Sequence, residues 1–164
     1  MRKSLVDKAH YIEKLASAIE DAKPYFVDSE SKIRTGKSKT NKFPKKPGIY
    51  LILRRVNLED KDYTTKGINT KSPLILYVGK TTSRRNINER LKDHFGGNKL
   101  NFQGSQFRKF LMQVCQDEEV VKKILWNQDT LIACVPIEEP DEVIDKVENL
   151  TIQVFQPRFN IKDR

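Results

Sequence analysis

Apolar residues in this chain fall into short continuous runs and into stripes with helical spacing. Two runs of branched and aromatic residues, 48–56 and 74–79, predict strands, because such side chains suit a pleated, buried surface. A third run, 129–137, predicts a third strand. Apolar residues spaced three and four apart predict helices over 4–22, 86–95, 105–116, 118–125 and 140–154. The chain is therefore expected to be α+β, with a small, mainly antiparallel three-stranded sheet flanked by helices and an N-terminal helical arm.

The same periodicity assigns inward faces to the last helices. The helix at 105–116, which Ser105 would cap, is expected to turn five residues inward: Phe107, Phe110, Leu111, Val114 and Cys115. The final helix is expected to place a stripe of four residues in the core: Val143, Val147, Leu150 and Val154. Glu148 shares a side of that helix with Ile144, Thr151, Ile152 and Phe155. A carboxylate there is either half-buried at the edge of the core or placed for a chemical task.

Polar stretches divide the chain into three parts. Residues 1–27 hold the N-terminal amphipathic helix, residues 28–45 form a basic connector, and residues 46–161 form the main domain. Residues 57–72 are a polar insertion between the first two strands. Two interpretations of the first helix stay open, namely packing on the main domain or service as an arm that contacts DNA or a second copy.

Charge is unevenly distributed along the chain. There are 31 Lys and Arg residues against 22 Asp and Glu residues, for a formal net charge of +9. The net charge is +6 over residues 1–47, +8 over 48–110 and −5 over 111–164. A positive field around the first two strands favours a polyanion such as nucleic acid, although a lysine-biased soluble surface is the plain alternative.

Composition excludes several classes of site and location. The two cysteines, Cys115 and Cys134, have no CxxC spacing, which argues against a thiolate zinc site and against a disulfide scaffold. The chain has no apolar signal core and no stretch of membrane-spanning length. We therefore expect an intracellular, cytoplasmic protein without a membrane partner.

Candidate chemistry gathers around the first two strands and the basic segment after them. Tyr50 and Tyr77 lie on the strands, and Arg90 and His94 are four apart on the next helix, so they share one line of it. Two tyrosines facing an Arg–His pair suit a phosphate site. Taken singly, each has an ordinary explanation: strand aromatics, a surface cation, a helix-end histidine. Glu148 alone is likewise a weak signal for a hard cation such as Mg²⁺.

In order along the chain, these pieces resemble one family. Five stretches are similar, in the same order, to the motifs of GIY-YIG nucleases. They are Gly48-Ile49-Tyr50, Tyr77-Val78-Gly79, the helix carrying Arg90 and His94, Glu148-Asn149-Leu150-Thr151-Ile152 and Gln156-Pro157-Arg158-Phe159-Asn160. The resemblance covers about residues 46–161. The connection over residues 51–76 is longer than is common in the family, and long connections occur in its restriction-enzyme branch.

The resemblance implies phosphodiester hydrolysis with one divalent metal, Mg²⁺ or Mn²⁺. Glu148 would hold the metal, and Arg90 would bind the phosphate as charge builds there. Tyr50, favoured over Tyr77, would activate the water, and His94 would either lower the tyrosine pKa or accept its proton. Asn160 would position Glu148 or a backbone group, and Gly79 would help to position the site. The expected phosphate contacts are Lys80, Arg84, Arg85, Lys45 and Lys46, which could instead be simply solvated.

The function expected is a DNA endonuclease in restriction or defence, or in mobile-element or repair cleavage. The alternative is a nucleic-acid-binding module that does not cut, or a docking subunit of a larger DNA-processing complex. Cleavage of a palindromic site would favour a homodimer.

Overall fold

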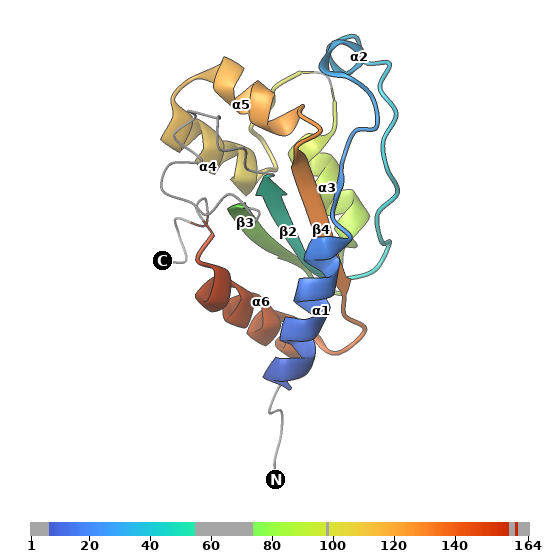
Figure 1. Cartoon of the computed structure of the whole chain (residues 1–164), viewed down its shortest axis with the longest axis vertical. Coiled ribbons are helices and arrows are strands. Elements are labelled where there is room, and N and C mark those ends of the chain that lie inside the picture. Colours follow the sequence, from blue (N-terminus) through green and yellow to red (C-terminus); the bar gives the residue numbers. More distant parts are fainter. Residues whose placement is uncertain (1–6, 55–73, 98, 158–159, 161–164) are drawn as a thin grey trace.

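The computed structural model describes residues 7–54, 74–97, 99–157 and 160 (Figure 1). The predicted insertion at 57–72 lies outside the described residues. The elements in chain order are α1 (Lys8–Glu20), β1 (Lys23–Pro24), α2 (Glu30–Arg34), β2 (Gly48–Arg54), β3 (Leu74–Thr81), α3 (Ile87–Phe95), α4 (Gln106–Cys115), α5 (Glu118–Leu125), β4 (Thr130–Pro136) and α6 (Asp141–Phe155). Among the described helices, none is both long enough and apolar enough to cross a membrane.

The strands form one antiparallel sheet in the order β1-β4-β2-β3. The three predicted strands are all present, and the α+β class is confirmed. The predicted count of three is one short, because the two residues of β1 add a fourth strand by pairing with β4. Two residues are too few to produce a period of two, so no pattern could indicate this strand.

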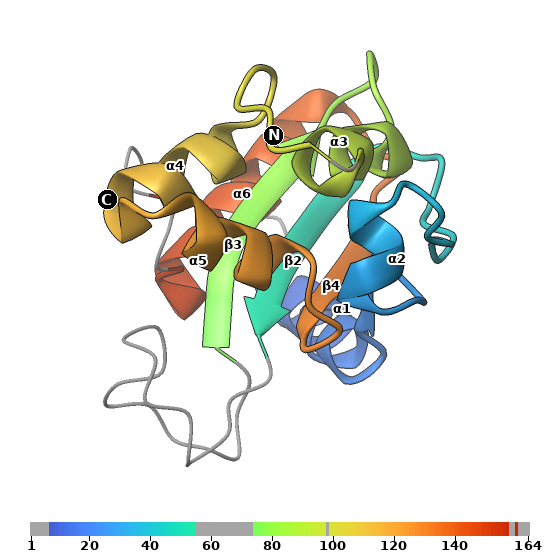
Figure 2. The ribbon, with the colours of Figure 1, turned by 90° about the horizontal axis from the view of Figure 1, so that it is seen from above.

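Strand β2 lies inside the sheet and is buried on both faces. Its side chains alternate, as the pleat requires. Ile49, Leu51 and Leu53 enter a core with α1 and α6, whereas Tyr50 and Ile52 enter a second core with α3, α4 and α5. The molecule therefore has three layers, with α1 and α6 on one side of the sheet and α3 to α5 on the other (Figures 1 and 2).

Helix α1 is part of the layer that covers the sheet. Asp7 caps its first turn by accepting a hydrogen bond from the His10 N–H. Tyr11 and Leu15 are buried in the same core as β2 and β4, and the helix also contacts α6. The N-terminal helix thus packs on the main domain through its apolar face.

The segment predicted as a basic connector contains more structure than expected. It includes the short helix α2, and it buries Ile33 and Phe43 in the core beside Tyr25. These isolated apolar residues anchor a stretch that is otherwise charged. Because each stands alone among polar and basic residues, the sequence around it shows no helical or strand periodicity that would predict its burial.

Two predicted inward stripes are wrong at their ends. On α6 the buried residues are Ile144, Val147 and Thr151, while Val154 is exposed. On α4 Val114 is exposed, and Arg108 is buried instead. In the same last turns Cys115 and Phe155 still pack against the cores, so Val114 and Val154 are exposed because they lie on the other side of their helices.

Candidate active site

Tyr50 is positioned by the middle of β2. Its side chain is fully buried, and its ring lies over Gly79, the residue paired with it on β3. A Cβ added to Gly79 would lie 2.2 Å from the phenolic Cζ and Oη of Tyr50. Only a residue without a side chain leaves room for the ring, which explains glycine at this point of the strand.

The Tyr50 hydroxyl meets His94 from α3. Tyr50 Oη lies 2.6 Å from His94 Nε2, and His94 Nδ1 lies 2.8 Å from Ser105 Oγ. All three side chains are buried. Tyr50 and His94, which the sequence placed on neighbouring elements, are therefore joined by a direct hydrogen bond. Ser105, which the sequence indicated only as a helix cap, forms the next contact on the other side of the His94 ring.

Burial and charge shift these groups in opposite directions. Burial raises the Tyr50 pKa well above 10, the charges of Tyr77 and Glu148 add to the increase, and the Arg90 guanidinium opposes it. Burial lowers the His94 pKa well below 6.5, and the positive charges of Arg90, Arg108 and Arg85 lower it further. At neutral pH the pair is therefore a neutral phenol beside a neutral imidazole.

Arg90 lies on the same line of α3 as His94, one turn earlier. Its Nη1 donates to the Gly104 carbonyl at 2.8 Å and to Asp93 Oδ2 at 3.3 Å. The side chain is partly exposed, and its positive charge acts on the Tyr50 hydroxyl by lowering the pKa of that group. It thus links the buried phenol to solvent, where a phosphate could bind its remaining donors.

Tyr77 completes an aromatic cluster around His94. Its ring centroid is 5.7 Å from that of His94, 6.4 Å from that of Tyr50 and 5.2 Å from that of Phe107. Both tyrosines, the histidine and the arginine that were singled out in the sequence are therefore together in space.

Glu148 comes from α6, on the other face of the sheet. Since β3 is an edge strand, side chains from both faces can meet beside it. Lys80, near the end of β3, places its Nζ 2.9 Å from Glu148 Oε2 and 2.8 Å from Asp145 Oδ1. Burial alone would lower the Lys80 pKa, but the hydrogen bonds and charges of these two carboxylates together raise it. The sequence predicted that Lys80 would contact phosphate. In the structure it contacts Glu148, the residue predicted to bind the metal.

These carboxylates fit a hard divalent cation. Asp145 and Glu148 are three residues apart on α6 and already converge on one positive charge, the Lys80 ammonium. Magnesium is commonly bound by one or two carboxylates, with waters and phosphate oxygens completing its shell. Within the described part of the chain, no group of three or more His, Cys, Asp or Glu side chains gathers around a common point. Water and substrate would have to supply the other ligands.

Asn160 acts on backbone rather than on Glu148. Its side-chain amide accepts from the Val78 N–H at 2.8 Å and donates to the Val78 carbonyl at 2.7 Å. Val78 lies between Tyr77 and Gly79 on the open edge of β3. Asn160 thus satisfies the edge strand at the level of the site and holds that strand in place.

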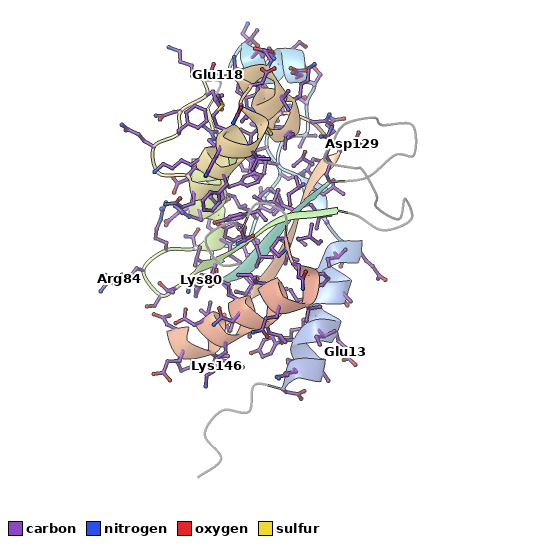
Figure 3. The ribbon with its side chains drawn as sticks, turned by 90° about the vertical axis from the view of Figure 1, so that its left-hand side faces the viewer. Glu13, Lys80, Arg84, Glu118, Asp129 and Lys146 are labelled. Atoms are coloured by element: carbon purple, nitrogen blue, oxygen red, sulfur yellow. The ribbon has the colours of Figure 1, made fainter. Side chains whose placement is uncertain are left out.

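The remaining candidate phosphate contacts lie around the start of α3. Arg84 is exposed and points away from the body of the protein (Figure 3). Its loop is tied to α6, because Asp141 accepts from the Ser83 N–H at 3.0 Å and from the Ser83 hydroxyl at 3.1 Å. Arg85 pairs with Asp93 at 2.7 Å, and Lys46 pairs with Glu138, while Lys45 is exposed.

Arg108 is the buried residue that sequence analysis missed. It lies on α4 and donates to three carbonyls, of His94 at 2.6 Å, Gly96 at 2.9 Å and Asn101 at 2.9 Å. The guanidinium thereby closes the C-terminal end of α3, where the helix dipole favours a cation. A signal was available, since Arg108 adjoins Phe107 and stands three residues before Leu111 on the apolar side of α4.

The arrangement combines a buried phenol, a neutral imidazole, a partly exposed guanidinium and a carboxylate at the edge of the sheet. The family model described as GIY-YIG catalytic domain matches residues 48–131, which is about half of the chain and runs from β2 into β4. No curated protein matches the chain.

Proposed function

This chain belongs to the GIY-YIG catalytic domain family, and on that premise we propose that it is a divalent-metal-dependent endonuclease that hydrolyses DNA phosphodiester bonds. The family supports nuclease activity in general. The observation that carries the proposal is the joining of the two family signatures in one site. Tyr50 from the first signature lies over Gly79 from the second and contacts His94 at 2.6 Å.

Each side chain has a physical role in this proposal. Tyr50, a neutral phenol at rest, first loses its proton to solvent, and the phenolate then takes a proton from water; the resulting hydroxide forms the new P–O bond while the bond to the 3′-oxygen breaks. Arg90 neutralises the charge that builds on the phosphate in the transition state. Glu148 would hold Mg²⁺ or Mn²⁺, which when bound polarises the phosphate and stabilises the leaving oxygen. That oxygen then takes a proton from solvent.

The Lys80 ammonium is part of the same proposal. It contacts Glu148 in the described structure, so it must give up that contact when a metal takes its place. Asp145 offers a second carboxylate 2.8 Å from the ammonium, which keeps Lys80 beside the site without Glu148. From there Lys80 can reach a phosphate oxygen, together with Arg84 and Arg85 from the following loop.

The unit proposed to carry this activity is residues 46–161, with α1 packed on it as an outer layer. Restriction or defence, mobile-element cleavage and repair all remain within the proposal. The restriction role predicts discrete fragments from a palindromic site and a homodimer whose mass depends on concentration. Nicking of a particular DNA structure would instead favour repair.

The test is cleavage of supercoiled plasmid with Mg²⁺ or with EDTA. Glu148→Gln keeps the size of the side chain and removes its charge, and we expect it to lower the cleavage rate about 1,000-fold, because several kcal/mol of charge stabilisation are lost. Glu142→Gln, the same change at an exposed position of α6, should cut at the wild-type rate.

Binding separates the two candidate functions. Glu148→Gln should still bind DNA in EDTA, because the basic surface is unchanged. Cleavage by this variant at the wild-type rate would refute the assigned metal ligand. Salt-sensitive DNA binding without cleavage in any metal would instead support a module that binds and does not cut.

A further inference from the structure

Ser105 connects the active site to the start of α4. Its Oγ accepts a hydrogen bond from the Arg108 N–H at 3.1 Å, which caps the helix, and it lies 2.8 Å from His94 Nδ1. The residue is 1% exposed, so solvent has almost no access to the hydroxyl. Of the described residues, these two are its hydrogen-bond partners. A cap alone does not require the second contact, which is directed at a residue of the site.

The direction of the second hydrogen bond follows from counting protons. A backbone N–H can only donate, so the Arg108 contact uses a lone pair of Ser105 Oγ. The hydroxyl proton then has His94 Nδ1 as the acceptor within reach, because a buried hydroxyl is hydrogen-bonded as a rule, and the same count closes at Tyr50 in its phenolate form, which has no proton to donate. An Nδ1 that accepts carries no proton. In a neutral imidazole the proton must therefore lie on Nε2.

The surroundings of His94 keep the ring neutral, which this count requires. Burial lowers its pKa, and so do the charges of three arginines: Arg90 on α3, Arg108 on α4 and Arg85 from the preceding loop. The titratable groups facing it from the sheet are Tyr77 on β3 and Tyr50 on β2, and the raised pKa of Tyr50 keeps that phenol neutral at pH 7.

We propose that Ser105 is a positioning residue that holds His94 in the tautomer protonated at Nε2, so that the ring donates a hydrogen bond to Tyr50 Oη. This inference rests on the proposed nuclease function for its catalytic meaning. Tyr50 Oη then accepts from His94, and this donor together with the positive charge of Arg90 favours the phenolate that removes a proton from water. His94 supports that phenolate and does not receive the tyrosine proton, which decides between the two roles left open by the sequence.

The tautomer can be measured directly on the unmodified protein. The chain has two histidines, so ¹⁵N-detected spectra of the imidazole nitrogens contain two ring systems, and His10→Gln assigns them. At pH 7 we expect His94 to be neutral with its proton on Nε2. A proton on Nδ1, or on both nitrogens, would overturn the inference without any variant.

Substitution at Ser105 tests the catalytic consequence. Ser105→Ala removes the donor to Nδ1, and we expect kcat for plasmid cleavage to fall about 10-fold with KM unchanged, together with a shift of the tautomer towards Nδ1–H. Ser105→Thr keeps both the hydroxyl and the cap and should restore kcat. Asp117→Ala removes the equivalent cap from α5, away from the site, and should leave kcat and the tautomer unchanged.

The outcomes separate this inference from the function on which it rests. Ser105→Ala with wild-type kcat and an unchanged tautomer would overturn the role of Ser105. If Asp117→Ala lowers kcat as much as Ser105→Ala does, the effect of Ser105 would come from helix capping alone. If the unmodified protein cuts no DNA, the proposed function fails, while the position of the His94 proton still decides whether Ser105 sets the tautomer.

Discussion

The Tyr50 ring occupies the space that a side chain at Gly79 would need. Gly79→Ala should therefore displace the ring or the strand, costing about 1–3 kcal/mol in the free energy of unfolding and most of the cleavage activity. Chemical denaturation measures the first effect and plasmid cleavage the second. Because the added methyl group meets both the ring and the hydroxyl, Tyr50→Phe should relieve only part of the loss in the double variant. A fully stable and active Gly79→Ala protein would refute the close packing.

His94 makes the stability of the protein depend on pH. Its folded-state pKa is lowered below 6.5, first by burial and then by three arginines, so the unfolded chain binds a proton more readily. The free energy of unfolding should hold above pH 6.5 and fall as the pH drops below it, by up to about 1.4 kcal/mol per pH unit from this one residue.

The measurement is chemical denaturation at a series of pH values from 7.5 to about 5. His94→Gln should lose this component of the slope, although the variant is less stable throughout. His10→Gln, at an exposed position of α1, should keep it. The idea fails if the unmodified protein and His94→Gln change in parallel with pH.

Among the helices, α3 and α4 act as a unit because Arg108 joins them. Arg108→Met leaves three carbonyls of the α3 end and the following loop without a donor in a buried place. We expect a loss of about 3 kcal/mol in the free energy of unfolding, because hydrogen bonds to a charged group are strong and their orphaned acceptors are costly. Lys109→Met, at the exposed neighbour, should change it by less than about 0.5 kcal/mol.

Helix α6 shows how an element can be predicted while its rotation is not. The stripe through Val154 and the stripe through Ile144 and Thr151 are both compatible with helical spacing. The sheet lies against the second of these and leaves Val154 exposed. That rotation turns Glu148 and Asp145 towards Lys80 on β3, and so decides which carboxylates line the site.

The protein as a whole carries +9, and its basic residues concentrate before and within the segment that builds the site. DNA binding should therefore weaken as salt rises, because each phosphate contact releases counterions. Arg84→Ala should lower the slope of log affinity against log salt by about 0.9, if Arg84 makes one such contact. Lys14→Ala on α1 is the matched change of charge away from the site and should leave the slope unchanged. An equal effect of both variants would mean that only net charge matters.

The three long strands, the five longer helices and the family follow from the sequence, because they depend on local patterns. Alternation, helical spacing and cap residues act within a few residues of one another, and the two signatures stand whole in the chain. The short elements β1 and α2 could not be predicted from the sequence, because stretches of two and five residues are too short to show a strand or helix periodicity. The anchoring of Phe43 is likewise visible only once Tyr25 lies beside it.

The sequence by itself determined which residues could do chemistry: two tyrosines, an arginine and a histidine on one helical line, and a carboxylate. The tertiary structure alone decided which polar atoms meet. Asn160 binds the backbone of Val78 across 82 residues, and Lys80 on β3 contacts Glu148 on α6. Ser105 reaches His94 because the loop between α3 and α4 brings the start of α4 back beside the His94 ring. The physical reason is that a buried hydrogen bond depends on tenths of an ångström and on the exclusion of water, and both are properties of packed elements rather than of residue order.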